Sequence, residues 1–241
     1  MSAETYRHIT ARPASPIIGA YVEDVDVSSP CDPAIYEEIK QALWRHHVVF
    51  LRNQPMTPAA HKALASAFGP MVPHEIFPSL DGHKEISILE ANCDRPPEND
   101  AWHTDVTFRE TPVLASILHG LTIPPSGGDT LFASQAAAFD ALSPPWQRML
   151  SELEAEHDVV HAFGETNVLK DAGGEAKIAE LRRTAPPKIH PMVIAHPITG
   201  RPGIFVNSVF TKRIIGLSKR ESDAILTTLF DMIKTPEFQV R

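Results

Sequence analysis

The stretch Asn99-Asp100-Ala101-Trp102-His103-Thr104-Asp105-Val106-Thr107-Phe108 carries an imidazole and a carboxylate two residues apart. We expect it to form a β-strand, in which residues i and i+2 point to one face, roughly 6–7 Å apart along the backbone. His103 and Asp105 would then supply two of the three ligands of a 2-His-1-carboxylate site for non-haem Fe(II). Such a triplet also arises by chance, so its meaning depends on the rest of the chain.

The bulk composition is that of an ordinary globular domain. The 241 residues are 43% hydrophobic and 22% charged, and a chain of this length buries about 70–75% of its unfolded surface in one large domain. A net charge of −8 without a Lys/Arg-rich run argues against nucleic acid or an anionic membrane as partner. A small anionic ligand remains compatible with it.

No targeting or cross-linking feature stands out. The chain has no apolar run near the roughly 20 residues that span a bilayer, and its polar N-terminus does not read as a signal peptide. Its 2 cysteines, Cys31 and Cys93, make a disulfide framework or a Cys-rich zinc site improbable. We therefore expect a cytoplasmic protein.

Helix starts are well marked. A capping residue precedes a proline at Asp32-Pro33, Thr57-Pro58 and Ser143-Pro144, and proline suits the first helical position. Ser218 and Glu221 form a capping box. Strand-like segments are Ile17–Val22, Val25–Val27, Val48–Arg52, Glu85–Leu89, Ala115–His119, Thr130–Ala133, residues 157–163, Met192–His196, Ile204–Asn207 and a start near Arg241. Together they predict an α+β fold with a jelly-roll-like core and helices outside it.

Residues 164–188 are polar and contain Gly173-Gly174 with a short predicted helix over 175–183. An excursion of this kind inside a compact domain is typical of an active-site lid.

Other catalytic signatures are missing. The sequence contains no G-x-S-x-G, H-E-x-x-H, G-x-x-x-x-G-K-[ST] or G-x-G-x-x-G motif. Among its 12 histidines, spacing nominates His196 as a third metal ligand. An equally good interpretation is a hydrogen-bonded histidine near the base of a sheet.

The sequence resembles the taurine dioxygenase family of Fe(II)/2-oxoglutarate oxygenases. The resemblance runs in order through nearly the whole chain, over residues 45–54, 99–108, 127–131, 155–158, 190–191, 196–197, 205–207, 210–214 and 236–241. It implies a double-stranded β-helix, or jelly-roll, core with flanking helices.

The resemblance also assigns roles. It implies that His103 and Asp105 are the first two iron ligands and that Thr130 binds the 2-oxoglutarate carboxylate. The implied substrate contacts are His74, Asn99, Phe163, Phe205 and Phe77. Without the resemblance, Phe163 and Phe205 read as core aromatics, and Asn99 and Thr130 as turn and strand residues.

The implied activity is hydroxylation of a small sulfonate such as taurine, releasing sulfite, an aldehyde, succinate and CO2. Its cofactors are Fe(II) and the co-substrate 2-oxoglutarate, and its partners are O2 and a small anion. The resemblance further implies a homo-oligomer, a dimer or a tetramer, with no nucleic-acid or membrane partner.

The family's distal histidine and its 2-oxoglutarate-binding arginine lie on strands after the motif found here at residues 236–241. We therefore expect a single dioxygenase domain over residues 1–241, truncated at its C-terminus. Because a bidentate arginine–carboxylate pair is hard to replace, we expect this chain to bind iron weakly and turn over poorly.

Three alternatives stay open. Phe77 and Ala162 stand where the family has hydroxyl-bearing residues, which favours a bulkier sulfonate, an alkyl sulfate or another small acid. A non-catalytic, dioxygenase-like binding protein is the second alternative. The third is a metal hydrolase whose site His196 completes.

Overall fold

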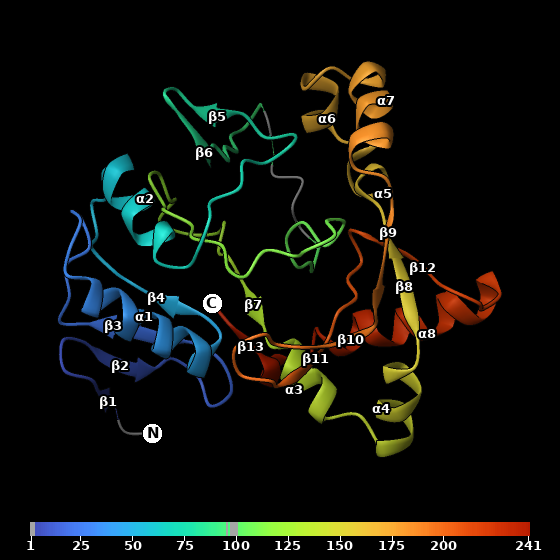
Figure 1. Ribbon diagram of the computed structural model, residues 1–241, viewed down its shortest axis with the longest axis horizontal. Helices are drawn as coiled ribbons and strands as arrows, with labels where there is room; N and C mark the ends of the chain where they lie inside the picture. Colours follow the sequence, from blue (N-terminus) through green and yellow to red (C-terminus); the bar gives the residue numbers. More distant parts are fainter. Residues whose placement is uncertain (1–2, 95, 97–100) are drawn as a thin grey trace.

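The computed structural model describes residues 3–94, 96 and 101–241. Its N-terminal part is a four-stranded sheet, in the order β1-β2-β3-β4, packed against two helices (Figure 1). The elements are β1 (Glu4–Thr5), β2 (Thr10–Pro13), β3 (Ala20–Glu23), α1 (Pro33–His46), β4 (Val49–Phe50) and α2 (Pro58–Ser66). Strands β3 and β4 run parallel, since α1 carries the chain back between them.

The predicted start of α1 is confirmed in detail. The Asp32 side chain accepts a hydrogen bond from the backbone N–H of Ala34, and Pro33 occupies the first turn. The helix ends at His47 in the left-handed conformation, with φ of 66°. Ile39 and Ala42 on its inner face are buried against β2 and β3 residues such as Ala11 and Val22.

The C-terminal half builds a second core. Its sheets have the orders β12-β8-β9, β10-β11 and β13-β7. Its elements are β7 (Phe132–Ala133), α3 (Gln135–Asp140), α4 (Pro144–Ser151), β8 (Glu154–His157), α5 (Val159–Phe163), β9 (Lys188–Pro191), β10 (Val193–Ala195), β11 (Pro202–Ile204), β12 (Thr211–Ile214), α8 (Lys219–Met232), the short 3-10 helix η1 (Pro236–Phe238) and β13 (Gln239–Val240). The apolar stripe of α8, with Leu226 and Leu229, packs on Met192 and Ile214.

A third core lies beneath the helices α6 (Asn167–Asp171) and α7 (Glu175–Thr184), at the top of Figure 1. Ile76 joins this core from the segment just before the hairpin of β5 (Ser79–Leu80) and β6 (His83–Ser87). Leu169 of α6 and Leu181 of α7 are each 1% exposed and pack with Phe163, Val106 and Phe210. The helices of the 164–188 segment are thus anchored next to the stretch that contains His103.

The expected mixture of helix and strand is confirmed, but several predicted strands are wrong. Residues 101–108 and 115–119 form no strand, and 157–163 is a strand only to His157 before α5 begins. Nor does Val25–Val27 form one. A strand needs a hydrogen-bonded neighbour, and in the part of the chain that the structure describes no strand pairs with residues 101–108 or 115–119. Helix α4 starts at Pro144 as predicted, although Ser143 makes no side-chain capping bond.

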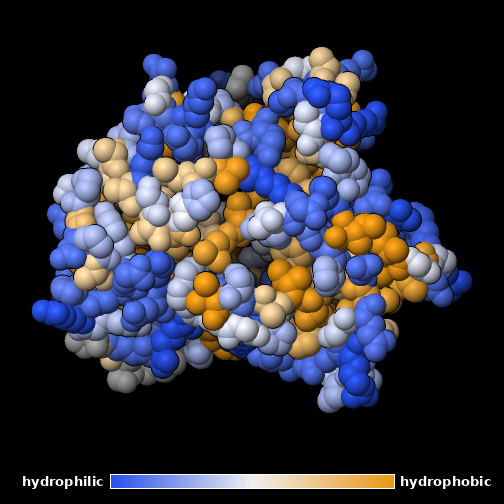
Figure 2. Space-filling model, in the orientation of Figure 1, coloured by the Kyte–Doolittle hydropathy of each residue, from blue (hydrophilic) through white to orange (hydrophobic). Residues whose placement is uncertain are grey.

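Hydrophobic residues gather around a hollow in the middle of the face in Figure 2, and hydrophilic residues surround them. Part of this chain's apolar surface is in the 114–131 segment, where Leu118, Leu121 and Ile123 are 60%, 86% and 68% exposed. In the described part of the chain, no helix is both long and apolar enough to cross a membrane.

Candidate active site

The backbone at residues 105–108 is a turn rather than the predicted strand. Val106 has a φ of 47°, a left-handed conformation that is rare for a β-branched residue and costs of order 1–3 kcal/mol. The turn persists because Val106, Thr107 and Phe108 are all buried, at 5%, 0% and 1% exposure. Strain of this kind concentrates at functional sites, so the turn marks the site as well as shaping it.

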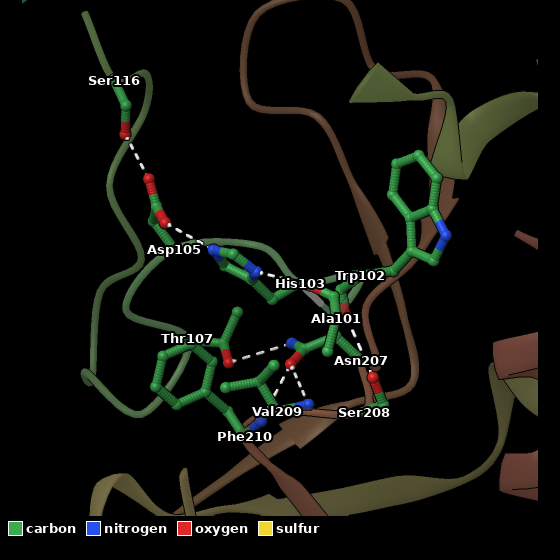
Figure 3. Close-up of polar contacts among 10 residues, drawn as sticks. All are labelled: Ala101, Trp102, His103, Asp105, Thr107, Ser116, Asn207, Ser208, Val209 and Phe210. Carbon is green, nitrogen blue, oxygen red and sulfur yellow. Dashed lines mark hydrogen bonds and ion pairs between the residues drawn. The ribbon is translucent and has the colours of Figure 1, made fainter. Parts of the chain in front are cut away.

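The turn brings His103 and Asp105 together, as the sequence predicted. Nε2 of His103 lies 3.3 Å from Oδ1 of Asp105, and its Nδ1 donates to the carbonyl oxygen of Ala101 at 2.9 Å. Ser116 Oγ donates to the other carboxylate oxygen, Oδ2, at 2.8 Å (Figure 3). Both side chains keep access to solvent, at 29% and 51% exposure.

This pair has the donor set and spacing of two adjacent metal ligands. The Nδ1–H bond to a carbonyl leaves the lone pair of Nε2 available to a metal, and a ligating histidine usually has this arrangement. Two ligands at right angles, each roughly 2.1 Å from a metal, are about 3 Å apart. Without a metal, the hydrogen bond between the two raises the pKa of His103 and lowers that of Asp105.

A third protein ligand is not assembled with them. No group of three His, Cys, Asp or Glu residues among those described is arranged to hold a metal. His196 instead packs on Trp44, with ring centroids 5.4 Å apart, and its Nδ1 accepts from the backbone N–H groups of Ile198 and Thr199. The alternative in which His196 completes the site is therefore wrong.

The His74 ring is held by the backbone that follows it, close enough to Asp105 for the charge of that carboxylate to act on it. Its Nδ1 accepts from the N–H groups of Ile76 and Phe77 at 3.1 and 3.4 Å, so its neutral form carries the proton on Nε2. Burial lowers the pKa of His74, partly offset by the charges of Glu75 and Asp105. The site therefore gains a neutral N–H donor beside the Asp105 carboxylate.

Aromatic rings form an apolar wall next to His74. Phe77 lies 4.5 Å from it and Phe163 lies 6.2 Å away, measured between ring centroids, and these two phenyl rings meet edge to face at 5.9 Å. Beside them is a cavity of about 310 Å³, lined by Ala101, His161, Ala162, Phe163, Thr166, Ser208 and Val209. Three members of the predicted substrate set, His74, Phe77 and Phe163, are thus in contact with one another, and of these Phe163 also lines the cavity.

Two other predicted residues, Phe205 and Thr130, lie elsewhere. Phe205 is buried at 6% exposure between the rings of His157 and His190, at 5.5 and 5.4 Å. Thr130 is exposed in the segment just before β7, next to Asp129, which pairs with Arg241 at 3.2 Å. Asn99 lies outside the described residues.

Sequence reasoning missed the residues that support the pair. Ser116 is 11 positions from Asp105, in a segment that read as a strand. Thr107, His157 and Asn207 form a buried hydrogen-bonded group behind it. The only sequence signal for these three residues was that all of them fall within the resemblance.

Comparison with known proteins decides the family. Residues 10–241 match the family described as Taurine catabolism dioxygenase TauD, TfdA family. The chain belongs to this family.

Several relatives of this chain are named for action on sulfur compounds. The chain is 32% identical to an alkylsulfatase of Acinetobacter baylyi, over 93% of this chain and 70% of the relative. It is also 32% identical to an alpha-ketoglutarate-dependent sulfate ester dioxygenase of Pseudomonas putida, over 97% and 77%. A taurine dioxygenase from Burkholderia xenovorans superposes with a TM-score of 0.79 at 35% identity, covering 97% of this chain and 75% of that one.

These matches confirm the predicted class. TauD, TfdA family members are 2-oxoglutarate-dependent dioxygenases, and this chain is one of them. The family uses Fe(II) and 2-oxoglutarate, the cofactors that the sequence predicted.

Proposed function

We propose that this dioxygenase hydroxylates an alkyl sulfate or alkyl sulfonate at the carbon that bears the sulfur group. The observation that carries the proposal is the His103–Asp105 pair at 3.3 Å, supported from both sides and next to the His74 donor. Hydroxylation of R–CH2–O–SO3⁻ gives a hemiacetal sulfate, which breaks its C–O bond to an aldehyde and hydrogen sulfate. An alkyl sulfonate breaks its C–S bond to an aldehyde and sulfite.

His103 and Asp105 are the metal ligands in this proposal. Fe(II) with 2-oxoglutarate and O2 supplies the oxidant for the C–H bond and yields succinate and CO2. Ala101 holds the imidazole through its carbonyl, and Ser116 holds the carboxylate. Thr130 binds the 2-oxoglutarate carboxylate through its exposed hydroxyl.

The substrate's anionic group is bound by His74, whose Nε2–H is free of the backbone bonds made by Nδ1. Phe77 and Phe163 exclude water and hold the alkyl chain, since two aromatic faces offer apolar area without a competing hydrogen bond. Asn99 and Phe205 complete the proposed substrate set by resemblance.

The cavity favours an alkyl chain over taurine. Its described lining contains no Asp or Glu, so the ammonium group of taurine would lose water without gaining a charged partner. The lining hydroxyls of Thr166 and Ser208 are uncharged and offer that ammonium group no ion pair, and Ala162 adds no hydroxyl. The alkyl sulfate named for relatives of this chain fits such a lining better.

Helices α6 and α7, within residues 164–188, are the proposed lid. Thr166 and Phe163 line the cavity at the base of this segment, and Leu169 and Leu181 anchor it. The core is proposed to have the family's double-stranded β-helix fold, supported by a TM-score of 0.79. A cytoplasmic homo-oligomer remains the proposed state.

Anaerobic titration tests the proposal. Fe(II) added with 2-oxoglutarate should produce a metal-to-ligand charge-transfer band, which His103→Ala should abolish. In air, hexyl sulfate and hexanesulfonate should yield succinate with sulfate or sulfite above the rate of His103→Ala, and taurine should yield less. A band without product from any substrate would favour the binding-protein alternative, and taurine as the best substrate would overturn the alkyl preference.

A further inference from the structure

A buried group of three polar side chains lies directly behind the His103–Asp105 pair. Thr107, His157 and Asn207 are 0%, 0% and 3% exposed. Thr107 Oγ1 is 2.9 Å from Nδ1 of His157 and 3.3 Å from Nδ2 of Asn207. The three residues come from the 105–108 turn, the end of β8 and the turn that precedes β12.

The direction of each hydrogen bond follows from the partners. Oδ1 of Asn207 accepts from the N–H groups of Val209 and Phe210 at 3.1 and 2.9 Å, so Nδ2 donates to Thr107. The Thr107 hydroxyl then has its proton free for Nδ1 of His157. Burial lowers the pKa of His157 to about 4, so its ring is neutral. Its Nδ1 pairs with the Thr107 hydroxyl, while its buried Nε2 has no hydrogen-bond partner among the described groups.

The 207–208 segment also contacts the opposite side of the pair. Ser208 Oγ donates to the carbonyl oxygen of Trp102, the residue before His103, at 3.2 Å (Figure 3). Asn207 thus holds the chain on the C-terminal side of Asp105, through its bond to Thr107. Ser208 holds the chain on the N-terminal side of His103, through its bond to Trp102. Both rest on a rigid turn, because the Asn207 N–H donates to Thr211 Oγ1 at 2.9 Å, and Thr211 opposes His157 in the β8–β12 pairing.

The strained turn requires such support. Val106, with its φ of 47°, is flanked by Asp105 and Thr107, and a conformation of this kind persists only where its surroundings fix it. The Thr107 bonds fix the residue that follows Val106. Loss of those bonds lets the turn relax and separates the Asp105 carboxylate from the imidazole.

We propose that Thr107, His157, Asn207 and Ser208 are positioning residues that hold His103 and Asp105 in ligand geometry from both sides. This rests on the proposed role of the pair as metal ligands. The proposal adds a clamp around the two ligands. Three of its residues, Thr107, His157 and Asn207, touch neither metal nor substrate.

The first test measures the metal-free protein. Thr107→Val removes the hydroxyl at nearly constant shape and should accelerate amide hydrogen exchange at residues 103–108 about tenfold or more. Thr107→Ser should restore the exchange rate of the original protein. Ser134→Ala is the matched control, because it removes another buried hydroxyl that caps α3 and should leave residues 103–108 unchanged.

The second test measures Co(II) affinity by anaerobic titration. Support of a ligand from outside the metal's own ligand set is typically worth about 10–100-fold in affinity, and Thr107→Val should lose that much. Ser208→Ala, on an exposed residue that does not endanger folding, should lose about threefold, as expected for one hydrogen bond. Ser134→Ala should match the original chain.

The outcomes separate the two proposals. Equal exchange rates and equal Co(II) affinity in Thr107→Val and Ser134→Ala overturn the clamp. Accelerated exchange in Thr107→Val, with no Co(II) bound by the original chain, supports the clamp and overturns the ligand role of the pair. Accelerated exchange with lost affinity, rescued by Thr107→Ser, supports both.

Discussion

Arg109 donates two hydrogen bonds to the carboxylate of Glu75, from Nε to Oε1 at 2.9 Å and from a terminal nitrogen to Oε2 at 2.8 Å. The same guanidinium donates to the carbonyl oxygen of Pro73 at 2.9 Å. These bonds fix the segment that carries His74 against the turn that carries Asp105. The position of the proposed anion donor therefore depends on an ion pair that contacts no substrate.

Glu75→Gln should weaken this fixation. One hydrogen bond of the bidentate pair becomes neutral and the other is lost, because the amide NH2 cannot accept from Arg109. The cost in the free energy of unfolding is about 1–3 kcal/mol. Because His74 then loses its fixed position, KM for the alkyl sulfate should rise about five- to tenfold, with kcat changed less. Urea unfolding and steady-state succinate assays measure the two effects.

Glu23→Gln is its matched control. Arg12 also donates two hydrogen bonds to Glu23, at 3.1 and 2.7 Å, but both side chains are about half exposed. An exposed pair of this kind contributes roughly 0–1 kcal/mol, and KM should not change. A KM that stays constant in Glu75→Gln as well would show that His74 does not need this support.

The buried His157 should make the protein acid-sensitive. Burial lowers its pKa in the folded protein to about 4, below the ordinary histidine value of 6.5, so between these two values the unfolded state binds more protons. The contribution of neutral His157 to the free energy of unfolding is fully present above pH 6.5 and is lost as the pH falls toward 4. At roughly 1.4 kcal/mol per pH unit, the loss between pH 7.5 and 5 is about 2 kcal/mol.

His157→Gln should remove that portion of the pH dependence. Urea unfolding at pH 7.5 and 5 should show a difference about 2 kcal/mol smaller than in the original chain. His161→Gln, on an exposed histidine, controls for the loss of an imidazole. An unchanged pH dependence in His157→Gln would mean that another group titrates in this window.

Leu181 should couple α7 to catalysis. It is 1% exposed and packs with Phe163 and Phe210, so Leu181→Ala leaves a void and costs about 2–5 kcal/mol. If α6 and α7 close the cavity, the variant should release more succinate per aldehyde formed, because water reaches the oxidant. Quantifying both products gives the ratio.

Leu229→Ala provides the comparison, since Leu229 is equally buried in α8 within a different core. It should lose similar stability and keep the product ratio near one. The lid assignment fails when the two variants show the same ratio.

Ser218→Ala should destabilise α8 alone. Ser218 accepts from the Glu221 N–H while Glu221 accepts from the Ser218 N–H. Loss of this cap typically costs about 1 kcal/mol. Thermal unfolding should record the loss, and succinate formation at 25 °C should be unaffected.

The sequence by itself determined the features that depend on neighbouring residues. Asp32, Thr57 and Ser218 begin helices as predicted because an N-cap needs only a backbone N–H two or three residues away. It also determined the family and the pairing of His103 with Asp105, which are two positions apart.

Only the tertiary structure decided how that pair is made. The chain turns at Val106 instead of extending, because burial of Phe108 and the contacts of Thr107 outweigh the strand propensity of the segment. Ser116, His157 and Asn207 reach the turn from 11, 50 and 100 residues away. Such contacts depend on the packing of separate elements rather than on local backbone preference, so sequence periodicity carries no signal for them.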